Sequence, residues 1–192
     1  MRPGITVCVT SIPPRARLLA RALASVALQD MQPDAITVEF DFTRTGAAAT
    51  KNRALARVDT HWVTFLDDDD TMLPNHLVTL FQAQAQSGAD VVYSTPFVPQ
   101  LGGPPTGPEH RYGLPFDADI LRQRSYIHTS ALARTELMRE AGGFQRPAGS
   151  QYDDWGCWLA MLDAGASFCH VDAQTFLWNH WEGNTSGDPA RW

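Results

Sequence analysis

The sequence predicts an α/β fold in which helices flank a mostly parallel central sheet, within a single domain. A length of 192 residues is typical of one domain. The chain is 44% hydrophobic and 19% charged, which lies in the range of folded globular proteins. Between residues 5 and 95, strand-like and helix-like patterns alternate strictly, as they do in βαβ units with parallel strands.

The first half of the chain carries the clearest pattern. Short apolar runs rich in β-branched residues predict strands at residues 5–10, 35–40, 62–66 and 90–93. Apolar residues at helical spacing predict helices at residues 17–28, 50–58 and 74–86, the last with a proline in its first turn. Because the strands of a parallel sheet end on one side, we expect a ligand site at their carboxyl ends.

The alternation stops at residues 96–113, where prolines and glycines form a loop too long for a simple connection. We interpret this segment as a lid or an acceptor loop. Beyond it, the pattern predicts strands at residues 126–133, 167–171 and 175–178, and helices at residues 135–141 and 153–162. A turn is expected at Gly142 and Gly143, and the polar tail 182–192 is expected to be irregular.

The net charge of −6 is concentrated in two places. Six acids lie in the runs Asp67-Asp68-Asp69-Asp70 and Asp153-Asp154, and they account for the whole acidic excess. An acidic chain argues against nucleic acid as a partner, because phosphate backbones are bound by clustered basic residues. No apolar run is long enough for a membrane span, so the sequence predicts no membrane association.

The three cysteines, Cys8, Cys157 and Cys169, lie among apolar neighbours and have no CxxC spacing. We predict that they are reduced residues of a cytoplasmic protein.

The run of four aspartates directly follows the apolar residues Phe65 and Leu66 of a predicted buried strand. Four neighbouring carboxylates cannot all ionise in a small space without a counter-cation, because each raises the pKa of the others. Oxygen ligands of this kind suit Mg²⁺ or Mn²⁺. A solvated turn is the alternative, with Asp70 capping the next helix, but the buried strand before the run disfavours it.

Several segments together resemble the family 2 glycosyltransferases of the GT-A fold. They are TVCVTSIPPR, VEFDFTRTGAAATKNRAL, WVTFLDDDDTMLPNHL, AGGF, QYDDWGCWLAML and WNHWEGNTSG, and they span roughly residues 5–186. The resemblance implies a metal-dependent, inverting transferase. Such an enzyme moves a sugar from a nucleotide diphosphate sugar, here expected to be a UDP-sugar, to a hydroxyl of a glycan, small molecule or protein.

The resemblance also implies which residues bind the donor. Thr10 and Ser11 would line the base and ribose pocket, and Asp41 would accept a hydrogen bond from the uracil N3–H. Lys51 would touch the nucleotide, with Asn52 beside it.

The acidic motifs acquire roles in the same way. Asp67 and Asp69 match the DxD motif: Asp69 would bind Mn²⁺ or Mg²⁺, Asp67 would contact the ribose or the metal, and Asp68 would be a donor contact. Asp154 matches the general base, and Asp153 stands beside it where glutamate is common.

Two histidines also have expected positions. His180 is a candidate third metal ligand, although it is shifted by one place from the usual histidine, and His76 is expected on a helix surface.

The single domain 1–192 would divide into a nucleotide-binding half at residues 1–95, the loop 96–113 and an acceptor and catalytic half at residues 114–192.

Two other functions fit part of the pattern. The segment VTFLDDDDT also resembles the signature of haloacid-dehalogenase-like phosphatases, with Asp67 as nucleophile and Asp69 as acid/base. The two strand-helix units before the run, and a lysine upstream of it, argue against that family. A nucleotide-sugar-binding or carbohydrate-binding protein without turnover is the second alternative, and the presence of both acidic motifs argues against it.

Overall fold

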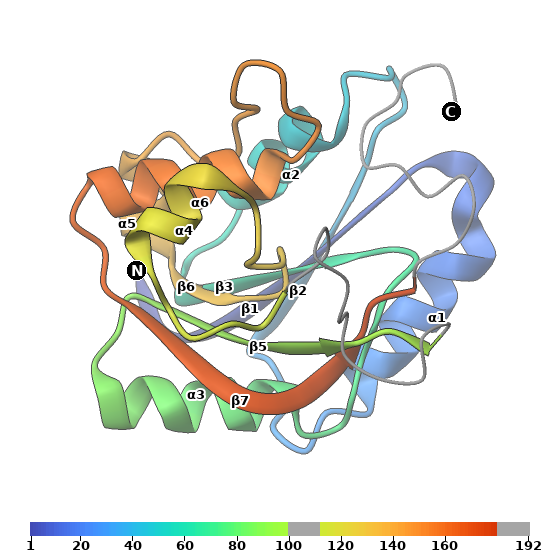
Figure 1. Ribbon diagram of the computed structural model, residues 1–192. Coiled ribbons are helices and arrows are strands. Elements are labelled where there is room, and N and C mark those ends of the chain that lie inside the picture. The colour runs from blue at the N-terminus through green and yellow to red at the C-terminus, as the bar shows by residue number, and fades with distance from the viewer. Residues whose placement is uncertain (100–111, 180–192) are drawn as a thin grey trace.

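The computed structural model describes residues 1–99 and 112–179 and confirms the predicted α/β fold (Figure 1). Seven strands form one sheet in the order β2-β1-β3-β6-β5-β7-β4. Helices cover both faces: α2, α4, α5 and α6 lie on one side, and α1 and α3 on the other (Figure 1). None of the helices in the described ranges has the length and apolar character needed to cross a bilayer.

The first half of the chain follows the predicted alternation. Its long strands are β1 (Arg2–Ser11), β2 (Ala35–Phe40), β3 (Thr60–Asp67) and β5 (Val91–Phe97). Its helices are the 3-10 turn η1 (Pro13–Arg15), α1 (Ala16–Ala27), α2 (Ala47–Ala56) and α3 (His76–Ser87). β1 pairs in parallel with β2 on one side and β3 on the other.

The second half contributes the short antiparallel pairings. Its elements are α4 (Ala118–Gln123), β6 (Leu132–Arg134), α5 (Thr135–Glu140), α6 (Asp153–Asp163) and β7 (Phe168–Leu177). β6 lies antiparallel between β3 and β5, and β7 pairs with β4 (Thr71–Met72) in the same sense. β7 runs parallel to β5 over most of its length, so the sheet remains mostly parallel.

The predicted strand at residues 126–133 is wrong over most of its length. Only its end belongs to β6, and residues 126–131 form an irregular segment. The Ala131 N–H donates to the His128 carbonyl at 3.2 Å, and the Ser130 N–H donates to Nδ1 of His128 at 3.2 Å. Local bonds of this kind compete with a strand ladder. Tyr126 and Ile127 are fully buried, which explains why the run looked strand-like.

Other boundaries also differ from the prediction. β5 continues through Pro96 to Phe97, with a register shift next to the proline, which has no N–H to donate. The two strands predicted at residues 167–178 are one strand, β7, whose register against β5 shifts at the same place. α4 and the two-residue β4 are too short to leave a periodic signal. Residues 100–111 and the tail 180–192 lie outside the described residues.

The core consists of a layer on each face of the sheet. Cys8 and Phe65 face the layer that packs on α2, α5 and α6, whereas Val7, Val9 and Leu66 face α1. This alternation is the period of two that a strand imposes. The three cysteines are free, with Cys8 and Cys157 buried and Cys169 half-buried.

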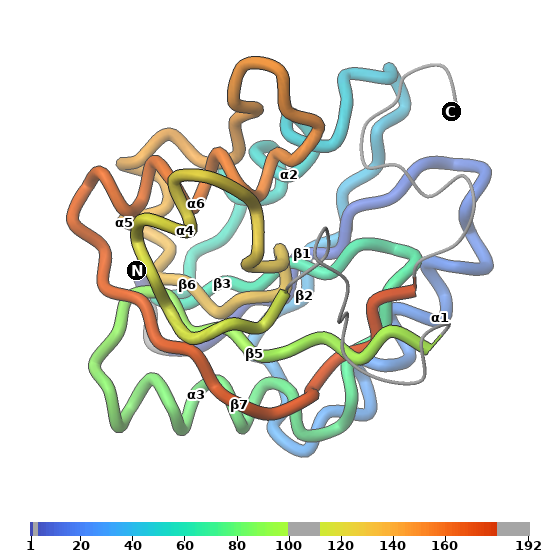
Figure 2. The backbone as a smooth tube through the Cα atoms, viewed as in Figure 1, coloured from blue at the N-terminus to red at the C-terminus, as the bar shows by residue number. Residues whose placement is uncertain are grey.

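The chain path explains how distant motifs meet. Figure 2 shows that the chain leaves β6, rises into the upper layer as α5 and α6, and returns along β5 as β7. α6 therefore begins in the layer that also contains α2, and α2 and α6 are in contact.

Candidate active site

The carboxyl ends of β1, β2 and β3 form the floor of the site. In the sheet register, Thr10 lies opposite Asp67, and Ser11 lies opposite Phe40 at the end of β2. The Asp41 N–H donates to the Ser11 carbonyl at 2.9 Å, which continues the ladder beyond β2. The sheet thus brings together four residues that the sequence predicts for donor binding.

The four aspartates form a tight turn at the end of β3, in which the Asp70 N–H donates to the Asp67 carbonyl at 3.0 Å. Asp68, Asp69 and Asp70 are buried, with 3%, 4% and 1% of their surface exposed. Burial raises the pKa of all three carboxyls, and the neighbouring aspartates help to raise that of Asp69 to about 8. The run is therefore not the solvated turn of the alternative interpretation.

Arg15 and Ser11 hold the middle of this turn. Nη1 of Arg15 lies 3.0 Å from Oδ1 of Asp68 and 3.3 Å from Oδ2 of Asp69. The Ser11 hydroxyl donates to Oδ2 of Asp68 at 2.6 Å. Arg21 of α1 donates to the Asp69 carbonyl at 2.6 Å. Asp68 and Asp69 therefore make their side-chain contacts toward β1 and η1.

Lys51 of α2 connects the first acidic motif to the second. Its Nζ lies 3.3 Å from Oδ1 of Asp67 and 3.3 Å from Oδ2 of Asp153, and its side chain is 3% exposed. Burial alone lowers the pKa of the ammonium, but the charges of Asp153 and Asp67 outweigh burial and raise it. The same ion pair lowers the pKa of Asp67 against the opposing effect of burial. The two motifs are thus parts of one site.

Asp154 lies next to Asp153 in the first turn of α6 and is buried. Its Oδ1 accepts a hydrogen bond from the Trp155 N–H at 2.8 Å. Burial and the charge of Asp153 raise the pKa of Asp154 to about 6, while Lys51 and His128 act in the opposite direction. A carboxyl with a pKa near the working pH is suited to general base catalysis.

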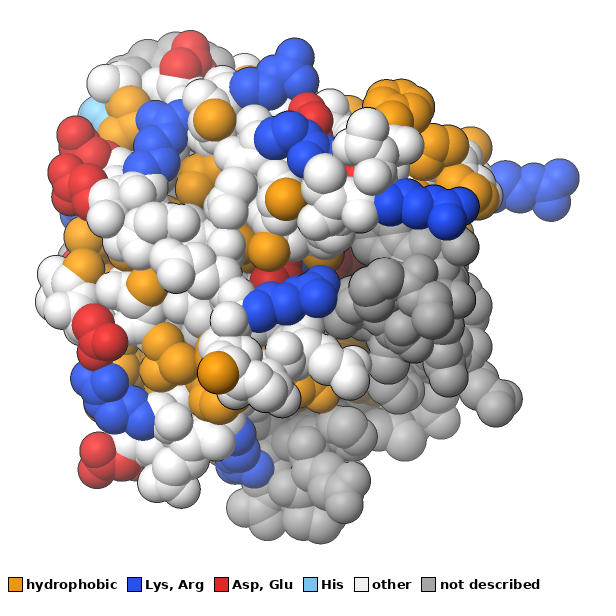
Figure 3. Space-filling view, turned by 90° about the horizontal axis from the view of Figure 1, so that it is seen from above, with side chains coloured by type: hydrophobic (Ala, Val, Ile, Leu, Met, Phe, Trp, Pro, Cys, Tyr) orange, Lys and Arg blue, Asp and Glu red, His pale blue; other side chains and the backbone are white. Residues whose placement is uncertain are grey.

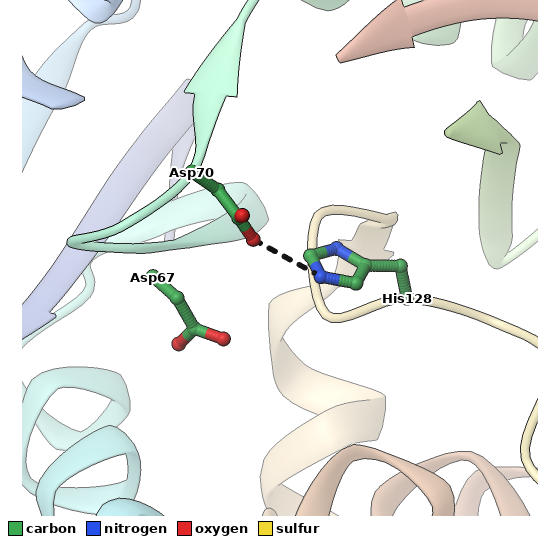
Figure 4. A group of neighbouring side chains, drawn as sticks. All are labelled: Asp67, Asp70 and His128. Carbon is green, nitrogen blue, oxygen red and sulfur yellow. Dashed lines mark ion pairs between the residues drawn. The ribbon is translucent and has the colours of Figure 1, made fainter. Parts of the chain in front are cut away.

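Asp67, Asp70 and His128 form a group that could hold a metal ion. One ligand atom from each lies within 4.8 Å of the others, and Nε2 of His128 is 3.2 Å from Oδ2 of Asp70. Figure 4 shows Asp70 facing the His128 ring, with Asp67 beside them. Two carboxylates match the oxygen ligands that Mg²⁺ and Mn²⁺ prefer, and the imidazole adds a nitrogen ligand. The donor set therefore fits the predicted ion.

This group overlaps only in part with the ligands expected from the sequence. Asp67 is common to both sets, whereas Asp69 is paired with Arg15 and lies outside the group. His180 lies outside the described residues. Asp70 and His128 are the members that sequence reasoning missed.

His128 is held from several sides. Its Nδ1 lies 3.1 Å from the Ser130 hydroxyl, and its ring stacks on Phe176 with centroids 4.7 Å apart. Burial disfavours the imidazolium, but the bond to Asp70 and the charges of Asp70, Asp67 and Asp154 together outweigh burial and raise the pKa of His128. His76 is not on the surface as predicted: it is fully buried, and its ring bonds the Thr175 hydroxyl at 2.7 Å and the Ser130 carbonyl at 3.1 Å.

Asp41 is a buried acceptor at the end of β2. Oδ1 accepts from the Thr45 N–H at 2.9 Å and from its hydroxyl at 3.0 Å, and Oδ2 accepts from the Gly46 N–H at 2.7 Å. Burial alone raises the pKa of Asp41, but these bonds and the charge of Arg53 lower it overall. Asp41 therefore stays ionised and keeps lone pairs for a further donor.

Asn52 makes a structural contact. Its Oδ1 accepts from the Phe144 N–H at 2.8 Å, and its Nδ2 donates to the Phe144 carbonyl at 2.9 Å. This reciprocal pair fastens α2 to the predicted turn at Gly142 and Gly143, both of which adopt positive φ angles of 92° and 68°. A nucleotide contact for Asn52 stays a prediction.

The site contains more acidic than basic side chains. Ion pairs from Arg15, Lys51 and, when it is protonated, His128 reach five of the six carboxylates of the two motifs: Asp67, Asp68, Asp69, Asp70 and Asp153. Figure 3 shows acidic atoms in a recess near the middle of one face, next to a basic side chain. An excess of buried negative charge attracts a divalent cation.

Two further residues of the site lacked a signal in the sequence. Arg15 belongs to a proline-rich turn whose conformation decides where its side chain points. Asn179 follows β7, and its N–H donates to Oδ1 of Asp70 at 2.9 Å while its amide donates to the Asp69 carbonyl at 2.8 Å. Both contacts depend on tertiary structure, so no local pattern could predict them.

Two comparisons concern the sequence of the chain. The family described as Glycosyl transferase family 2 matches residues 14–159. No curated protein sequence gives a significant match.

Solved structures share the fold. TarS from S. aureus, residues 1–349 with UDP-GlcNAc, superposes with a TM-score of 0.72 at 17% identity over 97% of this chain and 60% of that chain. The mannosyltransferase PcManGT from Pyrobaculum calidifontis, with GDP-Man and Mn²⁺, gives 0.67 at 16% identity over 96% and 59%. The chain thus spans about three fifths of the length of these structures.

Proposed function

Because the chain belongs to glycosyltransferase family 2, we propose that it transfers a sugar from a nucleotide diphosphate sugar to an acceptor hydroxyl. The proposal includes inversion at the anomeric carbon and dependence on a divalent metal. Family membership also argues against the haloacid-dehalogenase alternative, which rests on the acidic run and on the later acidic pair Asp153-Asp154.

One observation carries the proposal: the two acidic motifs meet through Lys51. Asp67 at the end of β3 and Asp153 at the start of α6 both lie 3.3 Å from its ammonium. Sugar transfer needs residues that bind the donor and a residue that acts as general base, and both must face the same reacting carbon. The contact between the motifs supports this arrangement.

We propose that the reaction is a single displacement. Asp154 accepts the proton of the acceptor hydroxyl while that oxygen forms a bond to the anomeric carbon of the donor. The bond between this carbon and the diphosphate oxygen breaks, and its electron pair leaves with the diphosphate. Single displacement from the opposite face inverts the anomeric carbon.

A divalent metal, when bound, would offset the negative charge of the departing diphosphate. We propose Asp67 as one ligand, joined by Asp69 as the motif predicts or by Asp70 and His128 as the geometry indicates. Oδ2 of Asp69 contacts Arg15 at 3.3 Å, so a metal would bind Asp69 through Oδ1 or replace that contact.

The donor pocket is assigned to residues 1–95 and the acceptor side to residues 114–192. Thr10, Ser11 and Asp68 would line the pocket, with Asp41 as acceptor for the base. The similar structures carry UDP-GlcNAc and GDP-Man. We propose a UDP-sugar as donor, because the Asp41 carboxylate suits the N3–H of uracil. The acceptor would be a glycan, a small molecule or a protein.

A panel of nucleotide sugars tests the proposal. Nucleotide release would be measured with each donor in Mn²⁺ and in EDTA, with thermal shift to report binding. We expect release with a UDP-sugar in Mn²⁺ and its loss in EDTA. Donor binding without release for any acceptor class would instead support the nucleotide-sugar-binding alternative.

The variant Asp154→Asn separates the two ends of the site. It should bind donor as the unmodified protein does and lose about 10²- to 10⁴-fold in transfer, the usual contribution of a general base. Normal turnover in this variant would remove Asp154 from the proposed role.

A further inference from the structure

We propose that Lys51 is a positioning residue that holds the Asp153 carboxylate next to Asp67. It thereby fixes the first turn of α6, which contains Asp154, relative to the donor-binding residues around Asp67 (the donor end). This inference rests on the proposed function, and it differs from the nucleotide contact expected for Lys51 from the sequence.

The surroundings of Lys51 leave its ammonium little room to reach a ligand. Its side chain is 3% exposed, and Nζ lies between Asp67 and Asp153. Nζ also lies 5.3 Å from the centre of the Phe144 ring, a distance at which a cation is attracted to an aromatic face. A buried ammonium held on three sides acts on its neighbours rather than on a distant phosphate.

The backbone around Lys51 is equally fixed. The next residue, Asn52, bonds both backbone groups of Phe144 and so ties α2 to the segment before α6. α2 also contacts β1 and β2, whose ends form the donor pocket. Lys51 therefore projects from a rigid element that touches both ends of the site.

Asp153 depends on this ammonium. It is 2% exposed, and its Oδ2 has no hydrogen-bond partner among the described residues, although Nζ of Lys51 is 3.3 Å away. A buried carboxylate without its cation is strongly disfavoured. Removing the ammonium should therefore displace or protonate Asp153, and Asp154 is the next residue of the same helical turn.

The charge of Lys51 also reaches Asp154. Asp153 and burial oppose ionisation of the Asp154 carboxyl, whereas Lys51 and His128 favour it. Tyr112 lies near enough for the charge of Asp154 to affect its own pKa. Among these groups, Lys51 is the cation that contacts both acidic motifs.

Lys51 is the only lysine in the sequence, which permits a direct test. Protein labelled with ¹⁵N-lysine gives one Nζ signal in its NMR spectrum. Titration with paramagnetic Mn²⁺ should broaden this signal, diamagnetic Mg²⁺ should shift it without broadening, and Asp67→Asn should abolish both effects. A signal unaffected by saturating Mn²⁺ would overturn the link between Lys51 and the donor end.

Variants test the link between Lys51 and the proposed general base, Asp154. Lys51→Met removes the charge at similar length and should lower kcat about 10- to 100-fold, as loss of a supporting contact does, with a smaller change in donor KM. Loss of donor affinity alone would overturn the proposal in favour of a nucleotide contact. Arg57→Met is the matched control and should keep kcat, because Arg57 is an exposed cation at the C-terminal end of the same helix and pairs with Glu39.

A second variant separates positioning from stability. Lys51→Met leaves a buried carboxylate unpaired, so it should melt at a lower temperature, and Lys51→Met/Asp153→Asn should recover most of that loss. The double variant should nevertheless stay low in kcat. Full recovery of kcat along with the melting temperature would show that Lys51 only balances charge, which contradicts the proposal.

These experiments also separate this inference from the proposed function. If no nucleotide sugar supports transfer, the proposed function fails. The NMR response to Mn²⁺ and the melting temperatures still show whether Lys51 joins the two motifs.

Discussion

Asp154 is buried, and the role of general base proposed for it requires a charged carboxylate. Burial and the charge of Asp153 raise its pKa to about 6, so the carboxylate is the minor form at acidic pH. A base must be deprotonated to accept the acceptor proton, so activity should fall as the pH drops through this pKa.

The expected pH profile follows with a definite sign. kcat/KM should rise between about pH 5 and pH 7 and level off above that range, since the profile reports the free-enzyme base. Asp154→Asn should be slow throughout and should lack this acid limb. The measurement is the initial rate of nucleotide release across buffers of constant ionic strength. A flat profile in the unmodified protein would contradict Asp154 as base.

The metal ligands give a second prediction at the scale of single residues. We expect His128→Ala to weaken Mn²⁺ binding about 10- to 100-fold in calorimetry, because it removes one member of the preformed group. His61→Ala, at an exposed histidine of β3, is the control and should bind normally. If the affinity for Mn²⁺ is unchanged in His128→Ala but lost in Asp69→Ala, the metal binds Asp69, as predicted from the sequence, and does not bind His128.

Sequence reasoning selected candidate site residues from two acidic runs. Asp67 stands out because the aspartates follow an apolar strand, Asp154 because an acidic pair precedes an apolar helix, and Lys51 because it belongs to a recognisable motif. His128 carries no such sign, because it lies in an apolar run and gains its environment from Asp70, Ser130 and Phe176. A residue positioned largely by partners from two distant segments, here Asp70 and Phe176, has no local pattern.

At the scale of elements, α6 packs closely on the chain before it. A Cβ atom at Gly156 would lie 1.8 Å from the Gln145 carbonyl oxygen and 3.0 Å from Pro147. This contact sets the position of the helix that carries Asp153 and Asp154. Alanine has a higher propensity than glycine in a helix interior. The lack of space for a Cβ atom, and not helix propensity, therefore explains the glycine at this position.

Gly156→Ala should therefore destabilise the protein despite that propensity. We expect the free energy of unfolding to fall by about 1–3 kcal/mol, as in other overpacked sites, measured by denaturant titration. Asp163→Ala, at the exposed end of the same helix, removes a surface ion pair with Arg122 and should have a smaller effect. A stabilised Gly156→Ala would show that the Gln145 segment can move away freely.

Element prediction succeeded where one pattern dominated and failed where two overlapped. β2 was predicted with its observed bounds because an apolar β-branched run sits between turns. Residues 126–131 failed because buried side chains mimic a strand while the backbone forms local bonds. Pro96 was taken as the start of a loop, although a register shift lets β5 continue through it.

At the scale of the whole molecule, the fold concentrates charge. The net charge of −6 equals the two acidic motifs, and the sheet and α6 bring these motifs to one site. The sequence predicted the fold class because alternating strands and helices constrain topology strongly. It did not predict that β6, which is only three residues long, is inserted antiparallel between β3 and β5.

This concentration of charge predicts that the ion stabilises the fold as a whole. An ion that binds only the folded state adds about 2.7 kcal/mol at one hundred times its Kd. Mn²⁺ or Mg²⁺ should therefore raise Tm in a thermal melt, and EDTA should reverse the rise. The rise should be lost in Asp67→Asn and kept in Glu140→Gln, which removes an exposed acid at the end of α5. An equal rise in both variants would place the ion away from the acidic turn, since only Asp67 belongs to it.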